Sequence, residues 1–224
     1  MGAGILITKT LAATLKLPRD PAAVKTLNGT IRTESVVLPA IAFGPVHPSA
    51  LRVMVQDLSF LERNLGISLG GIIGLDILAS RSFTIDYRKK LIAFGAIPPE
   101  LKTVPFAATA PSLTVQVKID GQQVRLVLDS GTGGVLLYRN RVTVTPVASH
   151  FDRTAAISTR SGSSRLSWRK TRVSVGEVDL GTRQIAIADV DSNFGYEFDG
   201  LMGFPKMGFH RVAFDFQNGR FGWD

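Results

Sequence analysis

The clearest alternation of apolar and polar residues runs through 113–119, LTVQVKI, where every second side chain is apolar. A period of two is typical of a strand with one buried face. The polar stretch DGQQ then predicts a turn, and the alternation resumes at Val124, Leu126 and Leu128. The pattern therefore predicts a β-hairpin over 113–128 whose second strand ends directly before Asp129.

Similar strand and turn signals recur through 142–190, whereas long helical periodicity is nearly absent. Short helices are predicted only within 8–17 and 75–80. The sequence thus predicts a mainly β chain with few short helices. A proline-containing, Ala/Thr-rich segment at 96–111 predicts a linker between a first lobe, 1–95, and a second lobe, 112–224.

Two stretches at the ends of these lobes have similar sequences. GIIGLDILASRSFTIDYRKKLIAFG at 71–95 aligns without a gap with GLMGFPKMGFHRVAFDFQNGRFGWD at 200–224. Gly71 falls on Gly200, an offset of 129 residues. Two copies are too few for a solenoid, so the repeat predicts a duplicated all-β lobe.

The same offset can be applied to LVLDSGTGG at 126–134. It places Gly131 on Gly2, and Asp129 on the position immediately before Met1. The first lobe is therefore expected to lack the aspartate that would match Asp129, together with the strands before it. We expect a full-length protein to carry Asp-Ser/Thr-Gly upstream.

Composition narrows the classes of function. The 224 residues are 45% hydrophobic and 20% charged, as in an ordinary globular chain. The net charge is +8, but no nucleic-acid motif accompanies it, and the densest basic patch, at 165–172, is typical of a solvated hairpin face. With no cysteine and three separated histidines, we expect no thiolate chemistry, no metal and no cofactor. The compartment stays open; export is expected if an upstream signal exists.

Asp129 is the candidate for chemistry because paired carboxylates can hydrolyse peptides. Two carboxylates within hydrogen-bond distance share a proton, since both cannot ionise easily. The ionised member can activate a water while the protonated member polarises a carbonyl. Gly131 would permit a tight turn, and the hydroxyls of Ser130 and Thr132 can orient the carboxylate. On their own, these four residues most often form only a turn.

Taken together, the motifs resemble those of the retropepsin-like aspartic proteases in their bacterial two-lobed form. The matching elements of the second lobe are the paired strands 113–128, LVLDSGTGG, the polar turn near Gly162, and DGLMGF at 199–204. The first lobe matches from Gly2 onward and includes GIIGLDIL and FTIDYRKKLIAFG. The resemblance implies duplicated acid-protease β-barrel lobes and an aspartic endopeptidase that hydrolyses polypeptides.

The resemblance also assigns roles around the aspartate. It implies that Asp129 is one half of the catalytic dyad, supported by Gly131. It implies that Ser130 ties the two active-site loops together and that Thr132 lies near the outer carboxylate oxygen. The element Leu201-Met202-Gly203 is implied to pack against the loop that carries Asp129.

A flap over the substrate is implied at the turn of Ser161, Gly162 and Ser163, with Asn28-Gly29 as its counterpart in the first lobe. The extended substrate would lie between flap and floor as an added strand. The chain departs from the family pattern in that Met1 stands where Ser or Thr is expected, and neither turn contains a tyrosine.

Several alternatives remain open from the residues themselves. Asp86 and Asp215 are related by the repeat but lack a following glycine, so we interpret them as structural. Asp76 is expected to make a local cap or turn contact. Instead of an intrachain pair, two copies could form a homodimer that pairs two Asp129 residues. A chain with one aspartate could also be a non-catalytic peptide-binding or interaction domain.

Overall fold

The computed structural model describes residues 4–26, 29–109, 112–142, 153–159, 162–189 and 198–224. The chain divides into two compact units, residues 2–81 and residues 82–224, which are called here the N-terminal unit and the C-terminal unit. The prediction of a mainly β chain is confirmed, with 54% of residues in strands and 12% in helices. Within the described ranges, no helix is long and apolar enough to span a membrane.

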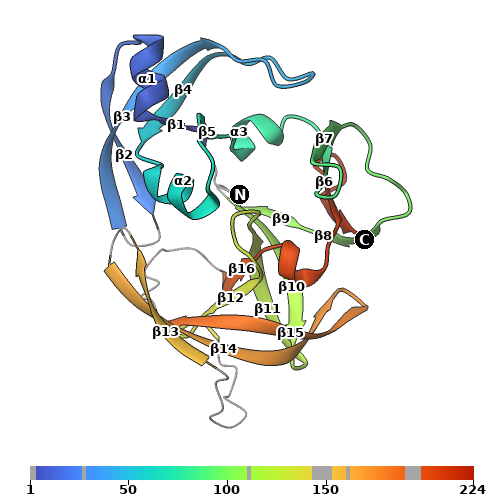
Figure 1. Cartoon of the computed structure of the whole chain (residues 1–224). Helices are drawn as coiled ribbons and strands as arrows, with labels where there is room; N and C mark the ends of the chain where they lie inside the picture. The colour runs from blue at the N-terminus through green and yellow to red at the C-terminus, as the bar shows by residue number, and fades with distance from the viewer. Residues whose placement is uncertain (1–3, 27–28, 110–111, 143–152, 160–161, 190–197) are drawn as a thin grey trace. The chain divides into compact units, whose positions relative to one another are not determined.

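The N-terminal unit contains a five-stranded sheet in the order β2-β3-β4-β1-β5. Its strands are β1 Leu6–Thr8, β2 Asp20–Thr26, β3 Gly29–Ala40, β4 Ser49–Gln56 and β5 Gly71–Ile72. Strand β1 is parallel to β4 and antiparallel to β5. Figure 1 shows β2, β3 and β4 in blue to cyan, with α1 beside them.

Three short helices accompany this sheet, namely α1 Lys9–Leu15, α2 Ser59–Leu65 and α3 Leu75–Leu78. Helix α1 begins where the Thr8 hydroxyl accepts a hydrogen bond from the Leu11 amide, a typical N-cap. The first and third helices lie within the two ranges predicted from the sequence. Helix α2 was not predicted; it is a helix of seven residues, none of which is buried.

The C-terminal unit contains an eight-stranded sheet in the order β13-β14-β15-β12-β16-β11-β10-β9. Its strands are β9 Ala107–Thr109, β10 Ser112–Ile119, β11 Gln122–Leu128, β12 Val135–Tyr138, β13 Arg153–Thr159, β14 Gly162–Val175, β15 Val178–Asp189 and β16 Gly200–Met202. The predicted hairpin is β10–β11, closed by Asp120 and Gly121 at positive φ, as a two-residue turn requires. Strand β10 also pairs with the end of β14, so the hairpin closes over the sheet.

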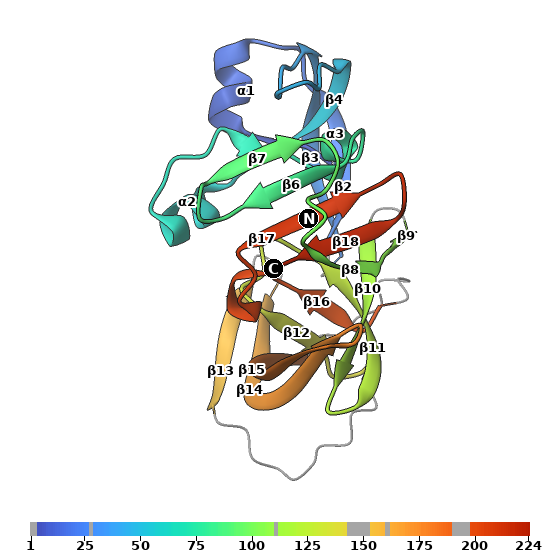
Figure 2. The same ribbon diagram turned by 90° about the vertical axis from the view of Figure 1, so that its right-hand side faces the viewer.

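A second sheet of this unit has the order β7-β6-β17-β18-β8, as Figure 2 shows. Its strands are β6 Phe83–Asp86, β7 Leu91–Phe94, β8 Lys102–Pro105, β17 Arg211–Asp215 and β18 Arg220–Trp223, and the short 3-10 helix η1 Pro205–Met207 precedes β17. The rings of Phe83, Phe214 and Phe221 of this sheet pack together with the ring of Phe204, and those of Phe83 and Phe214 are centred 4.9 Å apart. Their burial provides much of the unit's apolar core.

The strand pairing in this sheet explains where the chain divides into its two compact units. The sequence predicted lobes of 1–95 and 112–224 joined by a linker at 96–111. In the structure the compact units divide between Arg81 and Ser82, because β6 pairs with β17 and so attaches the hairpin β6–β7 to the C-terminal unit. The segment 96–111 contributes β8 and β9, which pair with β18 and β10.

Five strands have the same order and direction in each unit. The series β2-β3-β4-β1-β5 corresponds to β13-β14-β15-β12-β16, with the fourth strand parallel to the third and antiparallel to the fifth in both. Ile7 pairs with Gly71, as Leu137 pairs with Gly200. The sequence offset of 129 had aligned Leu137 with Thr8, so the strand register differs from that alignment by one residue. The duplication of the sequence itself stays a prediction.

Candidate active site

Asp129 lies at the end of a buried strand in the C-terminal unit. Leu126, Val127 and Leu128 of β11 are almost fully buried, and they pair in parallel with β16. The Asp129 amide continues this pairing by donating to the Met202 carbonyl at 3.0 Å. The Asp129 side chain is only half-buried, so the strand holds the backbone firmly while the carboxylate reaches the surface of the unit.

The loop that follows directs hydrogen bonds at both carboxylate oxygens. The Gly131 amide donates to Oδ1 at 3.0 Å, and the Thr132 hydroxyl donates to Oδ2 at 2.8 Å. The Thr132 amide also donates to the Asp129 carbonyl, at 3.2 Å. This is the turn expected of Asp-Ser-Gly, and it also orients the carboxylate. Burial acts to raise the pKa of Asp129, while the hydrogen bonds from Gly131 and Thr132 act to lower it by stabilising the charged form.

The backbone of Gly203 packs closely against this loop and fixes its position. A Cβ atom on Gly203 would lie 1.6 Å from the Thr132 carbonyl oxygen, so only glycine allows the close approach. The Gly203 amide donates to the Gly134 carbonyl, and the Lys206 amide donates to the Gly133 carbonyl, each at 2.9 Å. The loop is therefore held by backbone bonds, which make its shape insensitive to most side chains.

Tyr138 is a neighbour of the site that the sequence did not reveal. It is fully buried on β12 and packs against Phe198, with ring centroids 6.0 Å apart. Burial raises the pKa of Tyr138 far above its ordinary value, and the negative charge of Asp129 adds to the shift. The sequence of β12, Val135–Tyr138, is apolar throughout and has no alternation that would show which way Tyr138 faces.

The other predicted site residues are placed as follows. Ser130 is exposed. Gly162 and Ser163 begin β14 and pair with Thr159 and Ser158 of β13, next to the tip of that hairpin. Ser161 lies outside the described residues, as does Asn28. The predicted roles in tying the loops and forming the flap stay predictions.

Three further carboxylates have structural surroundings. Asp76 accepts from the amides of Ile5, at 2.8 Å, and Ile77, at 3.0 Å. Asp86 accepts from the Lys89 amide in the turn after β6. Asp215 caps the turn after β17, and hydrogen bonds led by the Asn218 side chain hold its pKa below the ordinary value. In the part of the chain that the structure describes, no group of three or more His, Asp or Glu is arranged to hold a metal ion.

Comparison with known families gives a match over residues 2–77, to the family described as aspartyl protease. The chain resembles an aspartyl protease. The resemblance to retropepsin-like aspartic proteases that the motifs predicted is thereby supported, and so is a protease function in general terms. The matched residues belong to the N-terminal unit, so the role of Asp129 is a separate question.

Among solved structures, one match is a crystal structure of a retropepsin-like aspartic protease from Rickettsia conorii. The aligned region covers 51% of this chain and 99% of that chain, with 12% sequence identity and a TM-score of 0.37. No curated protein sequence matches this aspartyl protease-like chain.

Proposed function

We propose that this chain acts as an aspartic-type endopeptidase and that Asp129 is one carboxylate of its catalytic dyad. The observation that carries the proposal is the pair of donors, Gly131 N–H and Thr132 O–H, aimed at the two oxygens of one carboxylate at the end of a buried strand. The aspartyl protease match over residues 2–77 supports the same class of chemistry.

In the proposed reaction the ionised carboxylate takes a proton from a water molecule, whose oxygen attacks the peptide carbonyl carbon. The protonated carboxyl of the pair donates a hydrogen bond to the carbonyl oxygen and so stabilises the tetrahedral intermediate. When the C–N bond breaks, the nitrogen takes a proton from the dyad and leaves as an amine. The hydrogen bonds from Gly131 and Thr132 hold the Asp129 carboxylate in one orientation throughout.

The substrate is proposed to be an extended polypeptide. Such a chain can add as a strand between the floor of the site and a covering hairpin. Gly162 and Ser163, next to the tip of the β13–β14 hairpin, are the described residues proposed to form part of this flap. Ser161 belongs to the same proposal.

The test is cleavage of a fluorogenic peptide library by the full chain over acid to neutral pH. We expect Asp129→Asn to lower the rate by about 10²–10⁴-fold, the usual contribution of a general acid–base group. The control is Asp86→Asn, which alters a turn carboxylate of the same unit and should leave the rate unchanged. Equal cleavage by wild type and Asp129→Asn would contradict the proposal.

The same assay identifies the source of the second carboxylate. If two copies pair their Asp129 residues, the activity per chain rises with protein concentration, because dimers form by mass action. If the pair lies within one polypeptide, the activity per chain is independent of concentration.

A further inference from the structure

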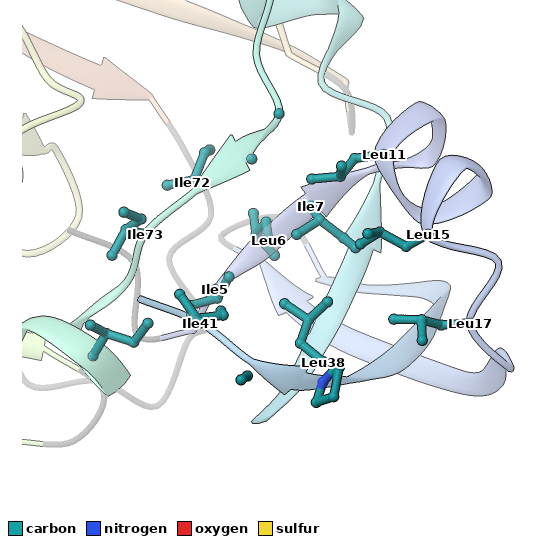
Figure 3. Close-up of a pocket in the computed structure, with 15 residues that line it drawn as sticks. Ile5, Leu6, Ile7, Leu11, Leu15, Leu17, Leu38, Ile41, Ile72 and Ile73 are labelled. Carbon is teal, nitrogen blue, oxygen red and sulfur yellow. The ribbon is translucent and has the colours of Figure 1, made fainter. Parts of the chain in front are cut away.

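Two cavities of this chain differ in the chemistry of their linings. The cavity of the N-terminal unit, about 660 Å³, is lined mainly by aliphatic side chains such as Ile5, Ile7 and Leu38 (Figure 3). A second cavity, of about 300 Å³, lies in the C-terminal unit, where β6 ends and β17 begins, and is called here the charged pocket. The described residues that line it all carry a charge or an imidazole: Asp86, Arg88, Lys89, His210, Arg211 and Asp224.

Backbone pairing holds the frame of the charged pocket. Asp86 pairs with Arg211 between β6 and β17, and the Tyr87 amide donates to the His210 carbonyl at 2.9 Å. The Arg211 amide donates to the Asp224 carboxylate, also at 2.9 Å. The turn after β6 and the residue after β18 are therefore fixed against the start of β17, so the pocket is organised in advance of any ligand.

The cations of the charged pocket are unequally paired. Arg211 has two carboxylate partners, since its guanidinium lies 2.8 Å from Glu100 and 2.7 Å from Asp224. Arg88 and Lys89 are exposed, and within the described ranges their side chains form no ion pair. These two cations can therefore bind an anion without first breaking a salt bridge.

The matching turn of the β17–β18 hairpin uses its side chains differently. Asp215 accepts from the Gln217 and Asn218 amides and from the Asn218 side chain, so that side chain closes its own turn. In the sequence repeat, Lys89 takes the place of Asn218. The Lys89 amide still donates to the Asp86 carboxylate, at 2.8 Å, whereas the Lys89 side chain lines the pocket. The backbone turn is thus kept, and its side chain is available to a ligand.

We propose that the charged pocket binds inorganic phosphate, which keeps at least one proton at neutral pH. Arg88, Lys89 and an imidazole N–H of His210 supply three separate donors, which match the oxygens of a phosphate better than the two oxygens of a carboxylate. Asp86 accepts from the Lys89 amide through Oδ1, and its Oδ2 accepts from the P–OH of the ligand. Sulfate has no proton to donate, so the Asp86 carboxylate repels it.

This inference does not depend on the proposed function, because none of the lining residues belongs to the Asp129 loop. The test is an NMR titration of the full nitrogen-15-labelled chain with sodium phosphate, at about pH 7.5 and an ionic strength held near about 0.15 M with sodium chloride. We expect saturable shifts of the amides at 86–90 and 210–211. Sulfate should bind at least about fivefold more weakly, the effect of one lost hydrogen bond. Glycerol 3-phosphate, mostly a dianion without a P–OH at this pH, should behave as sulfate does.

The variants separate a built site from general attraction to positive charge. Arg88→Gln and Lys89→Gln should each weaken phosphate binding about tenfold, because a hydrogen bond from a charged donor is lost. Lys90→Gln is the matched control, since it removes the same charge from the next residue of the turn, which does not line the pocket; it should bind as wild type does. Asp86→Asn should bring the affinities for phosphate and sulfate together. The same spectra show that each variant is folded.

Three results would overturn the proposal. The first is the absence of saturable shifts in the pocket. The second is equal weakening by Lys89→Gln and Lys90→Gln, which would show a diffuse charge effect. The third is equal affinity of wild type for phosphate and sulfate, or for phosphate and glycerol 3-phosphate, which would exclude recognition of the P–OH by Asp86.

Discussion

The loop before β1 and the loop before β12 lie at the same place in two sheets with the same strand order, but different groups hold them. In the N-terminal unit the Asp76 carboxylate accepts from the Ile5 amide at 2.8 Å. In the C-terminal unit the amides of Gly203 and Lys206 donate to carbonyls of the loop. The position that matches Asp76 in the sequence repeat is Pro205, which offers no carboxylate.

This comparison shows that the two carboxylates accept hydrogen bonds from different groups. Asp76 uses both oxygens on backbone amides of its own unit, so it acts as a structural anchor. Around Gly203 the loop is held by backbone bonds, and the half-buried Asp129 carboxylate accepts from the Gly131 amide and the Thr132 hydroxyl of that same loop. The predictions below test this difference, beginning with the largest expected effect.

Gly203 and Gly74 both permit a close backbone approach, but to different degrees. A Cβ on Gly203 would lie 1.6 Å from the Thr132 carbonyl oxygen, and a Cβ on Gly74 would lie 2.6 Å from the Gly4 carbonyl carbon. We expect Gly203→Ala to lower the free energy of unfolding by about 3 kcal/mol or more, and Gly74→Ala by less. Urea unfolding measures both. Gly133→Ala, whose Cβ meets only the Lys206 side chain at 3.5 Å, is the control; an equally large loss there would contradict the argument.

Asp86 lies in the turn of the β6–β7 hairpin and Asp215 in the turn of the β17–β18 hairpin, and β6 pairs with β17. The Asp215 carboxylate accepts more hydrogen bonds than that of Asp86. It accepts from the Ser82 hydroxyl, the Gln217 and Asn218 amides and the Asn218 side chain. We expect Asp215→Ala to cost about 2 kcal/mol of unfolding free energy, and Asp86→Ala about 0.5 kcal/mol. Thermal or urea unfolding at neutral pH distinguishes them, and equal losses would contradict the comparison.

The Asp215 contribution also has a defined pH dependence. Its folded-state pKa is lowered, first by the hydrogen bond from the Asn218 side chain. The stabilisation is therefore fully present above the unfolded pKa of about 3.9 and is lost as the pH falls through the lower folded value. We expect the difference in stability between wild type and Asp215→Ala to shrink below about pH 4. A difference that grows on acidification would contradict this sign.

Asp76 and Pro205 test the two ways of holding the loop. Asp76→Ala leaves the partly buried Ile5 amide without its acceptor and should cost about 1.5 kcal/mol. Pro205→Ala removes no hydrogen bond acceptor and should cost less than about 1 kcal/mol. Differential scanning calorimetry of both variants is the measurement. An Asp76→Ala protein as stable as wild type would show that the carboxylate does not anchor the loop.

The Thr132 hydroxyl donates a hydrogen bond to the Asp129 carboxylate, whereas the Thr8 hydroxyl accepts one from the Leu11 amide. Thr132→Val removes a donor that favours the ionised form, so the pKa of Asp129 should rise. Carbon-13 NMR titration of the carboxyl carbon follows it directly. If the proposed function holds, the acid limb of the cleavage rate also moves to higher pH. Thr8→Val should cost only about 1 kcal/mol of stability, through its lost N-cap, and leave that titration unchanged.

The alternation of apolar residues over 113–128 was sufficient to predict the β10–β11 hairpin and to place Asp129 at its end. The Asp-Ser-Gly-Thr order also anticipated the contacts of Gly131 and Thr132 with the carboxylate, because these bonds join residues adjacent in the chain. Local periodicity and turn chemistry are short-range properties, so a sequence displays them directly.

Tertiary pairing decided the rest. It assigned the β6–β7 hairpin to the C-terminal unit through β17, brought Asp76 to the Ile5 amide, and buried Tyr138 near Asp129. It also left Ile73 exposed where Met202 is covered. None of these follows from local pattern, because each depends on which distant strand occupies a given edge, and strand edges offer the same backbone groups whatever their sequence.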